Sequence, residues 1–244
     1  IHGWNFLGVS YNETRDMTRI LRDNKVNNRK YDLVEEEIKK EIKKSNEQLD
    51  ILNYYIQLLE DSKNILSEYL SKDEFSIEDV NNIENENEKL NRAKNIYKDF
   101  DFYGYTEEYL NQGLDQYNDF INYHFNVDFN GRTTNDNIYD INDTNYGDPN
   151  VSNIKESESH STHVSGIISA DRQNKDGNKG INNLAKIMVL RAVPNGDEYD
   201  KDVALAIRYA VDNGAKIING SFGKYFSSNP EWVIDAIRYA SEND

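Results

Sequence analysis

The sequence predicts an α/β domain that is interrupted by an all-α insertion. Two apolar stretches, residues 187–193 and 215–219, have the length and composition of buried strands, and a segment with helical spacing follows each of them. Strands and helices that alternate in this way form a parallel sheet with right-handed crossovers and helices on both faces. Residues 31–125 differ sharply, because they contain no proline, few glycines and many Glu, Lys, Asn and Leu residues. This composition favours long, solvated helices.

A strong negative charge limits the partners of the chain. Its 244 residues include 44 Asp and Glu against 28 Lys and Arg, which gives a formal net charge of −16. Because phosphate binding depends on Lys and Arg, we expect no nucleic-acid partner and no attraction to anionic membranes. No apolar run approaches the roughly 18 residues that span a bilayer. The absence of cysteine excludes disulfides and thiolate metal sites.

Both ends of the chain resemble domain interior. Gly3-Trp4-Asn5-Phe6 opens the sequence without a signal peptide, and a helical segment follows at residues 16–21. The last residues follow a helix that would normally lead into another strand. We therefore expect a fragment of a longer protein.

Three amphipathic helices are predicted within the insertion. The apolar seam of the first helix contains Val34, Ile38, Ile42, Leu49, Leu52, Ile56 and Leu59. Ser76-Ile77-Glu78-Asp79 has the form of a capping box and predicts the start of the second helix, and the third begins at Thr106. The prediction is an antiparallel helical insertion at residues 28–125 that divides a domain of residues 1–27 and 126–244. It is either a solvated structural element or an arm that binds partners or screens substrates.

The carboxy-terminal part contains two further predicted helices. One covers residues 202–213 and stops at Gly214, and the other begins at Asn229-Pro230, because proline fits the first helical position. Before them, residues 126–158 are rich in Asn, Asp, Thr and Gly and predict an irregular loop. Such a loop can hold calcium through oxygen ligands, but the spacing of an EF-hand is missing, so an ordinary cluster of turns is favoured.

Two histidines, His160 and His163, begin a helical pattern that continues with Val164, Ile167 and Ile168. Together with the small residues at positions 161, 165 and 166, this pattern predicts a buried helix that packs closely against a neighbouring sheet. A zinc-binding pair would need a spacing of four and a glutamate between the histidines, whereas this spacing is three. We therefore predict no metal ligands here, and we expect His163 to be a core residue.

Ser221, in Asn219-Gly220-Ser221-Phe222-Gly223, superficially resembles the nucleophile elbow of α/β-hydrolases. In that fold the order along the chain is serine, acid, histidine, and no histidine follows His163. We therefore predict that Ser221 lines a cleft at the carboxyl end of a strand.

Two motifs resemble those of the subtilisin-like serine proteases. His160-Ser161-Thr162-His163-Val164-Ser165-Gly166 is similar to their histidine motif, usually His-Gly-Thr-His-Val-Ala-Gly, and Ile217-Ile218-Asn219-Gly220-Ser221-Phe222-Gly223 is similar to a strand that borders the specificity pocket. The resemblance implies a partial subtilisin-like domain in which His160 is catalytic. It also implies that Ser221, Phe222 and Gly223 bind substrate, with Gly196 as a weaker match.

The departures from this family pattern concern the other catalytic residues. The sequence has no Asp-Ser/Thr-Gly, no Ala-Gly-Asn and no Gly-Thr-Ser, which carry the catalytic acid, the oxyanion hole and the nucleophile of the family. We therefore expect this chain to be inactive alone. The intact parent is expected to be an endopeptidase of the secreted or cell-envelope class that binds extended polypeptide without a cofactor. The alternative is a non-catalytic pseudoprotease or a helical protein-interaction module.

Overall fold

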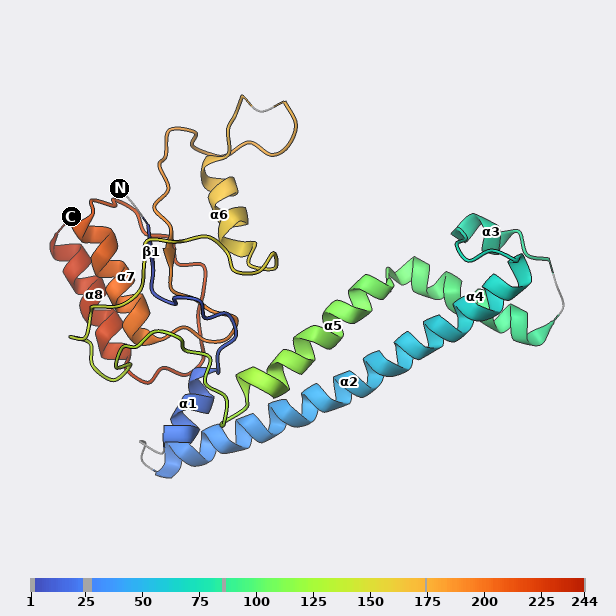
Figure 1. Ribbon diagram of the computed structural model, residues 1–244, viewed down its shortest axis with the longest axis horizontal. Helices are drawn as coiled ribbons and strands as arrows, with labels where there is room; N and C mark the ends of the chain where they lie inside the picture. The colour runs from blue at the N-terminus through green and yellow to red at the C-terminus, as the bar shows by residue number, and fades with distance from the viewer. Residues whose placement is uncertain (1–2, 24–27, 85–86, 174, 244) are drawn as a thin grey trace. The chain divides into compact units, whose positions relative to one another are not determined.

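The computed structural model describes residues 3–23, 28–84, 87–173 and 175–243 (Figure 1). It contains two compact units: the split unit, Ile1–Glu35 with Tyr123–Asp244, and the helical unit, Glu36–Asn122. Each is described by itself.

A short parallel sheet joins the two chain segments of the split unit. Strand β1 (Trp4–Asn5) pairs with β2 (Leu190–Arg191) in the register Trp4 with Leu190. The backbone N–H of Phe6 extends this ladder by donating to the carbonyl of Arg191 at 2.9 Å. The predicted strand at 187–193 is therefore formed over two residues only.

The prediction of a strand at 215–219 is wrong, because this segment of the described chain forms no strand. These residues pair with no neighbouring strand, and Ile217 is 89% exposed. A strand needs a neighbour for its backbone N–H and C=O groups, and an apolar run cannot supply one by itself.

Aromatic rings form the core next to the sheet. The rings of Phe6 and Tyr146 are 6.0 Å apart, and the ring of Tyr209 lies 6.4 Å from that of Phe6. Ala192 and Ala206 complete the buried cluster. This core holds β1, the 126–158 loop and the helix of Tyr209 together.

Among the described residues, four α-helices belong wholly to the split unit: α1 (Asp16–Asp23), α6 (His160–Ser169), α7 (Asp200–Asp212) and α8 (Pro230–Glu242). The predicted proline start of α8 is confirmed, and α7 begins two residues before its predicted start. Helices α7 and α8 lie side by side (Figure 1), and the Tyr239 hydroxyl of α8 donates to Asp212 at 2.6 Å.

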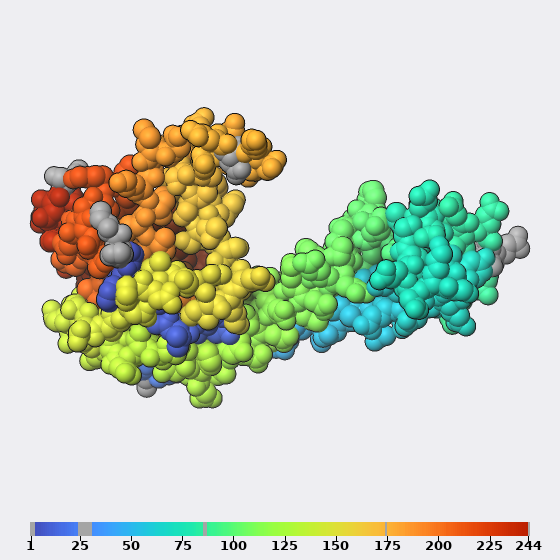
Figure 2. Space-filling view, turned by 45° about the horizontal axis from the view of Figure 1, so that its top comes forward, coloured from blue at the N-terminus to red at the C-terminus, as the bar shows by residue number. Residues whose placement is uncertain are grey.

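A buried ion-pair network fastens the 126–158 loop to α7. Arg132 donates to both carboxylate oxygens of Asp202 at 2.9 Å and also pairs with Asp136, which accepts a 2.7 Å bond from Lys201. Burial raises the pKa of Asp136, but the bonds from Arg132 and Lys201 outweigh it and lower that pKa to about 2. The remainder of the loop is irregular, as predicted, and Figure 2 shows its yellow-green residues at the surface.

The helical unit contains α2 (Asn28–Leu70) from Glu36 onward, α3 (Ile77–Asn81), α4 (Glu88–Tyr103) and α5 (Glu107–Asp119), and a π-helical turn, Phe120–His124, follows. The predicted capping box is present, with Ser76 and Asp79 bonded reciprocally. The second predicted helix is divided into α3 and α4, because the Asn87 side chain accepts from Leu90 N–H and caps a new helix. Every helix in the described part of the chain is too short or too polar to span a bilayer.

Candidate active site

His160 is the first residue of α6 and is exposed to solvent. Its Nε2 lies 3.2 Å from the carbonyl oxygen of Ser221, 61 residues along the chain. Because a carbonyl can only accept, the imidazole donates the proton in this contact. The structure thus brings the histidine motif and the 217–223 segment together.

An ion pair anchors the segment that leads into α6. Arg191 of β2 contacts Glu158, two residues before the histidine, and its guanidinium also donates to the carbonyl of Ser10 at 2.8 Å. Burial raises the pKa of Glu158, but the bond from Arg191 and a backbone bond from Ile154 outweigh it and hold that pKa below its ordinary value. The start of α6 is therefore tied to the sheet.

The prediction that α6 is buried and that His163 is a core residue is wrong. No residue of α6 is buried, and His163 is exposed. The prediction relied on a sheet beneath the helix, and residues 215–219 do not form that sheet in the described chain. Small residues such as Ser161 and Gly166 permit close packing but do not cause it.

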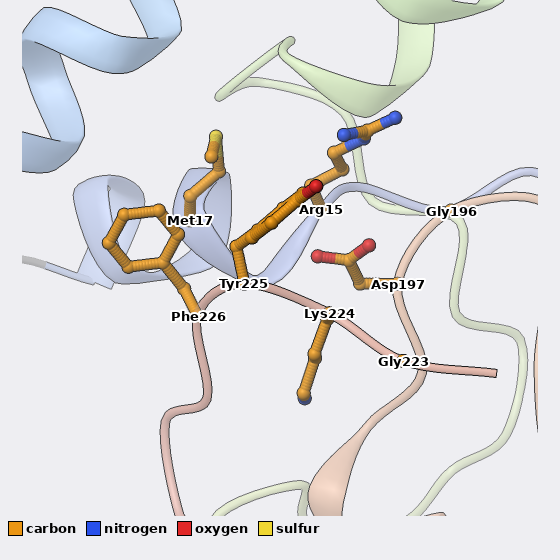
Figure 3. A pocket seen from close by; sticks show the side chains of 8 residues that line it. All are labelled: Arg15, Met17, Gly196, Asp197, Gly223, Lys224, Tyr225 and Phe226. Atoms are coloured by element: carbon orange, nitrogen blue, oxygen red, sulfur yellow. The ribbon is translucent and has the colours of Figure 1, made fainter.

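Gly196 and Gly223 line one pocket of about 330 Å³ (Figure 3). Its other lining residues come from α1 or its approach, from residue 197 and from the segment after Gly223: Arg15, Met17, Asp197, Lys224, Tyr225 and Phe226. The pocket therefore combines thioether and aromatic surface with the Asp197 carboxylate. Neither Ser221 nor Phe222 lines it, and Phe222 is 48% exposed.

Gly196 occupies a position that only glycine fits. Its φ is +149°, and a Cβ atom would lie 2.3 Å from the carbonyl oxygen of Glu13. The backbone is held there by two bonds of Asn195, which donates to Tyr11 and accepts from Glu13. This close approach forms one wall of the pocket.

Lys224 fixes the segment on the other side of the pocket. Its ammonium contacts Asp16 at 3.0 Å and Asp200 at 2.9 Å, and it donates to the carbonyl of Glu198 at 2.8 Å. In Figure 3 its side chain points away from Asp197. Sequence reasoning missed this clamp, although Asp16 and Asp200 each begin a helix, α1 and α7, where a carboxylate is favoured.

Burial and charge oppose each other at Asp16. Burial by itself raises the pKa of Asp16, but Arg19 and Lys224 outweigh it and hold that pKa below its ordinary value. The carboxyl also accepts bonds from the backbone and hydroxyl of Ser228 at 2.8 and 2.9 Å. Asp16 therefore remains ionised and orders the 224–228 segment.

The described residues contain no group of three acidic or histidine side chains that could hold a metal ion. The acidic 126–158 loop, considered above as a calcium ligand, uses its carboxylates differently. Asp136 binds Arg132 and Lys201, and Asp140 and Asp148 accept backbone N–H bonds within turns.

Known proteins resemble parts of this chain. It is 40% identical over 72 residues to the cell wall-associated protease of Bacillus subtilis (strain 168), which covers 29% of this chain and 8% of that protein. It is 38% identical over 86 residues to the thermophilic serine proteinase of Bacillus sp. (strain AK1). This match covers 35% of this chain and 20% of that protein. It is 37% identical over 79 residues to the halolysin of Haloferax mediterranei. This match covers 32% of this chain and 15% of that protein.

These matches span at most a fifth of each of these relatives. No solved structure matches the chain. The model of the subtilase family, in contrast, matches residues 25–244. The chain therefore belongs to the subtilase family.

Proposed function

We propose that this chain supplies the catalytic histidine and one edge of the substrate cleft of a serine endopeptidase. The observation that carries the proposal is the 3.2 Å contact between the His160 imidazole and the Ser221 carbonyl. It joins the two motifs that resemble the proteases, in a chain that belongs to the subtilase family. The pocket between Gly196 and Gly223 adds a place for a substrate side chain.

His160 acts as the general base in this proposal. It accepts the proton of a serine nucleophile and returns it to the leaving amine. In the contact described above, Nε2 carries the proton. A catalytic acid at Nδ1 would hold the ring in the other tautomer and free Nε2 to accept. The Asp-Ser/Thr-Gly and Gly-Thr-Ser motifs, which supply the acid and the nucleophile in the family, do not occur in this sequence.

The substrate in this proposal is an extended polypeptide. Residues 222 and 223 are exposed and not in a strand, so their backbone groups are available to pair with an added peptide strand. The Ser221 carbonyl, which contacts His160 here, would have to exchange that partner to pair with a peptide. Gly196 faces the same pocket as Gly223 and supplies backbone on the opposite side. The helical residues 28–125 are proposed to be an insertion into the domain formed by residues 1–27 and 126–244.

The location of the parent protein is proposed from its relatives. One of them is named a cell wall-associated protease and another an extracellular serine protease. We propose that the parent is likewise secreted or held in the cell envelope.

A fluorophosphonate probe tests the catalytic assignment. The 244-residue chain should remain unlabelled, because Ser221 has no histidine base in a triad. The gene product that includes the flanking coding sequence should be labelled, and His160→Ala should abolish labelling. Labelling of Ser221 in this chain would refute the proposal. An unlabelled, folded gene product would favour the pseudoprotease alternative.

Peptide binding tests the cleft separately. A Cβ atom on Gly223 would meet no protein atom within 4 Å, so Gly223→Val preserves the fold but fills the cleft. We expect it to abolish binding of an extended substrate peptide, whereas Gly220→Ala, which meets only ordinary contacts with Phe222, should leave binding intact. Unchanged binding in Gly223→Val would exclude this segment from the cleft.

A further inference from the structure

A continuous row of aromatic rings crosses the surface of the helical unit. It joins α2, the end of α4, the turn after it and α5, and its members are Tyr54, Tyr55, Phe102, Tyr103, Tyr105 and Tyr109. We call this surface the tyrosine row. Tyr105 is its centre, with the rings of Tyr55 and Tyr109 stacked at 5.9 Å and the ring of Tyr103 at 6.0 Å.

Most of the tyrosine row is not needed for the core of the helical unit. The buried cluster beneath it consists of Leu59, Phe100 and Leu110. In contrast, Phe102 is 80% exposed and Tyr103 is 66% exposed, and Tyr54 and Tyr109 are also more than half exposed. A contiguous exposed apolar surface of this kind marks an interaction site in a soluble unit.

The charges beside the tyrosine row are predominantly negative. Residues 45–62 and 99–109 supply all its rings, and neither segment contains a Lys or Arg. They contain eight exposed carboxylates: Glu47, Asp50, Glu60, Asp61, Asp99, Asp101, Glu107 and Glu108. Glu107 is paired with Lys63 and Glu47 with Lys43. The other six contribute net negative charge to this part of the surface.

We propose that the tyrosine row docks a basic, extended polypeptide segment. Lys and Arg side chains are attracted to the faces of aromatic rings, and here they would also meet carboxylates. This charge complementarity favours a basic peptide, because an acidic one is repelled and a neutral one gains nothing from the carboxylates. The proposal does not depend on the protease assignment.

A binding titration tests this docking site on the full chain. The ligand is a fluorescent octapeptide of alternating Arg and Gly, and a Glu-Gly octapeptide is the matched control. We expect the Arg peptide alone to bind, with an affinity that falls as salt is added. The variant Phe102→Ala/Tyr103→Ala/Tyr109→Ala should weaken binding by about tenfold or more, since each lost ring removes a modest cation–π contact.

Two further variants separate this role from a structural one. Asp99→Asn/Asp101→Asn/Glu108→Gln keeps every ring and should also weaken binding and flatten its salt dependence. Tyr69→Ala removes a 46% exposed ring of α2 outside the row and should change nothing. All variants should keep the circular dichroism spectrum of the unsubstituted chain.

Four results would overturn the proposal: the absence of Arg-peptide binding, unchanged affinity in the ring variant, equal binding of the Glu peptide, or binding of neutral cellohexaose through the same rings. Sedimentation that shows a dimer lost in the ring variant would assign the surface to a second copy of the chain instead.

Discussion

Replacing Lys224 with methionine tests whether the buried clamp of Lys224, Asp16 and Asp200 holds the 224–228 segment. The Lys224 side chain is 7% exposed, and its partners Asp16 and Asp200 are 4% and 5% exposed. Methionine retains most of the apolar volume and removes only the ammonium. The substitution therefore isolates the charge from the packing.

The expected loss of stability follows from the partners that remain. Removing one member of a buried ion pair costs about 3–5 kcal/mol, because the other member stays buried without compensation. Asp16 keeps bonds from Arg19 and Ser228, and Asp200 keeps a hydroxyl bond from Ser227 and a backbone bond at 2.7 Å from Asn229. We therefore expect Lys224→Met to lower the free energy of unfolding by about 3 kcal/mol, the lower end of that range.

Urea unfolding followed by tryptophan fluorescence measures this loss in the split unit alone. Both tryptophans, Trp4 and Trp232, belong to the split unit, and the helical unit has none. Arg238→Met is the matched control, since Arg238 and its partner Asp235 are 63% and 54% exposed. An exposed pair of this kind contributes at most about 1 kcal/mol.

The pH dependence of the variant provides a second observable. A carboxyl with a depressed folded pKa stabilises the protein above its unfolded pKa, and this contribution is lost as the pH falls. Without Lys224 the pKa of Asp16 rises from its depressed folded-state value, so the variant should lose less stability than the unsubstituted chain as the pH falls below about 4. The stabilising role of the clamp would be refuted if Lys224→Met lost no more stability than Arg238→Met and if the dependence of its stability on acidic pH were unchanged.

Four further substitutions test local features. Gly196→Ala should lower the free energy of unfolding by at least about 2 kcal/mol in the urea assay, because residue 196 has a positive φ and a Cβ there would meet the Glu13 carbonyl. Gly166→Ala is the control, since a Cβ on this residue of α6 meets open space, and it should be neutral or stabilising by up to about 1 kcal/mol. Ser76→Ala should destabilise the helical unit by about 1 kcal/mol in thermal unfolding followed by far-ultraviolet circular dichroism, since it removes a capping box. The pKa of Asp136, lowered from 3.8 to about 2, should make the split unit lose about 2 kcal/mol between about pH 4 and pH 2. Asp136→Asn should flatten the urea stability profile in that interval.

Local signals in the sequence predicted the helices of this protein well. Proline at the start of α8 and the Ser76 capping box act through the nearest few residues, so they can be recognised without knowing the fold. The break between α3 and α4 has a local cause too, because the Asn87 side chain caps the second helix. That cap was not recognised.

The strands and the buried charges depend on distant residues and were predicted poorly. β1 was not predicted, because Trp4 and Asn5 form a strand only through their pairing with β2. Lys201 is 1% exposed, although a lysine at the start of a helix normally faces solvent. Its partner Asp136 comes from the irregular loop, and no periodicity relates the two.

The predicted site residues were brought together in part. His160 contacts Ser221, and Gly196 shares a pocket with Gly223. The clamp around Lys224 could not be foreseen from the sequence, because its three partners come from distant parts of the chain. They are Asp16 of α1, Asp200 of α7 and the carbonyl of Glu198. The role of His160 in catalysis stays a prediction.

The kinetics of two histidine variants test the central claim most directly. The measurement is kcat/KM for peptide hydrolysis by the full-length gene product, with His160→Ala and His163→Ala compared. Both side chains are exposed on α6, so neither substitution should disturb the fold. We predict that His160→Ala lowers kcat/KM by about 10⁴-fold or more and that His163→Ala leaves it near the parent value. Retained activity in His160→Ala, or an equal loss in both variants, would contradict the account.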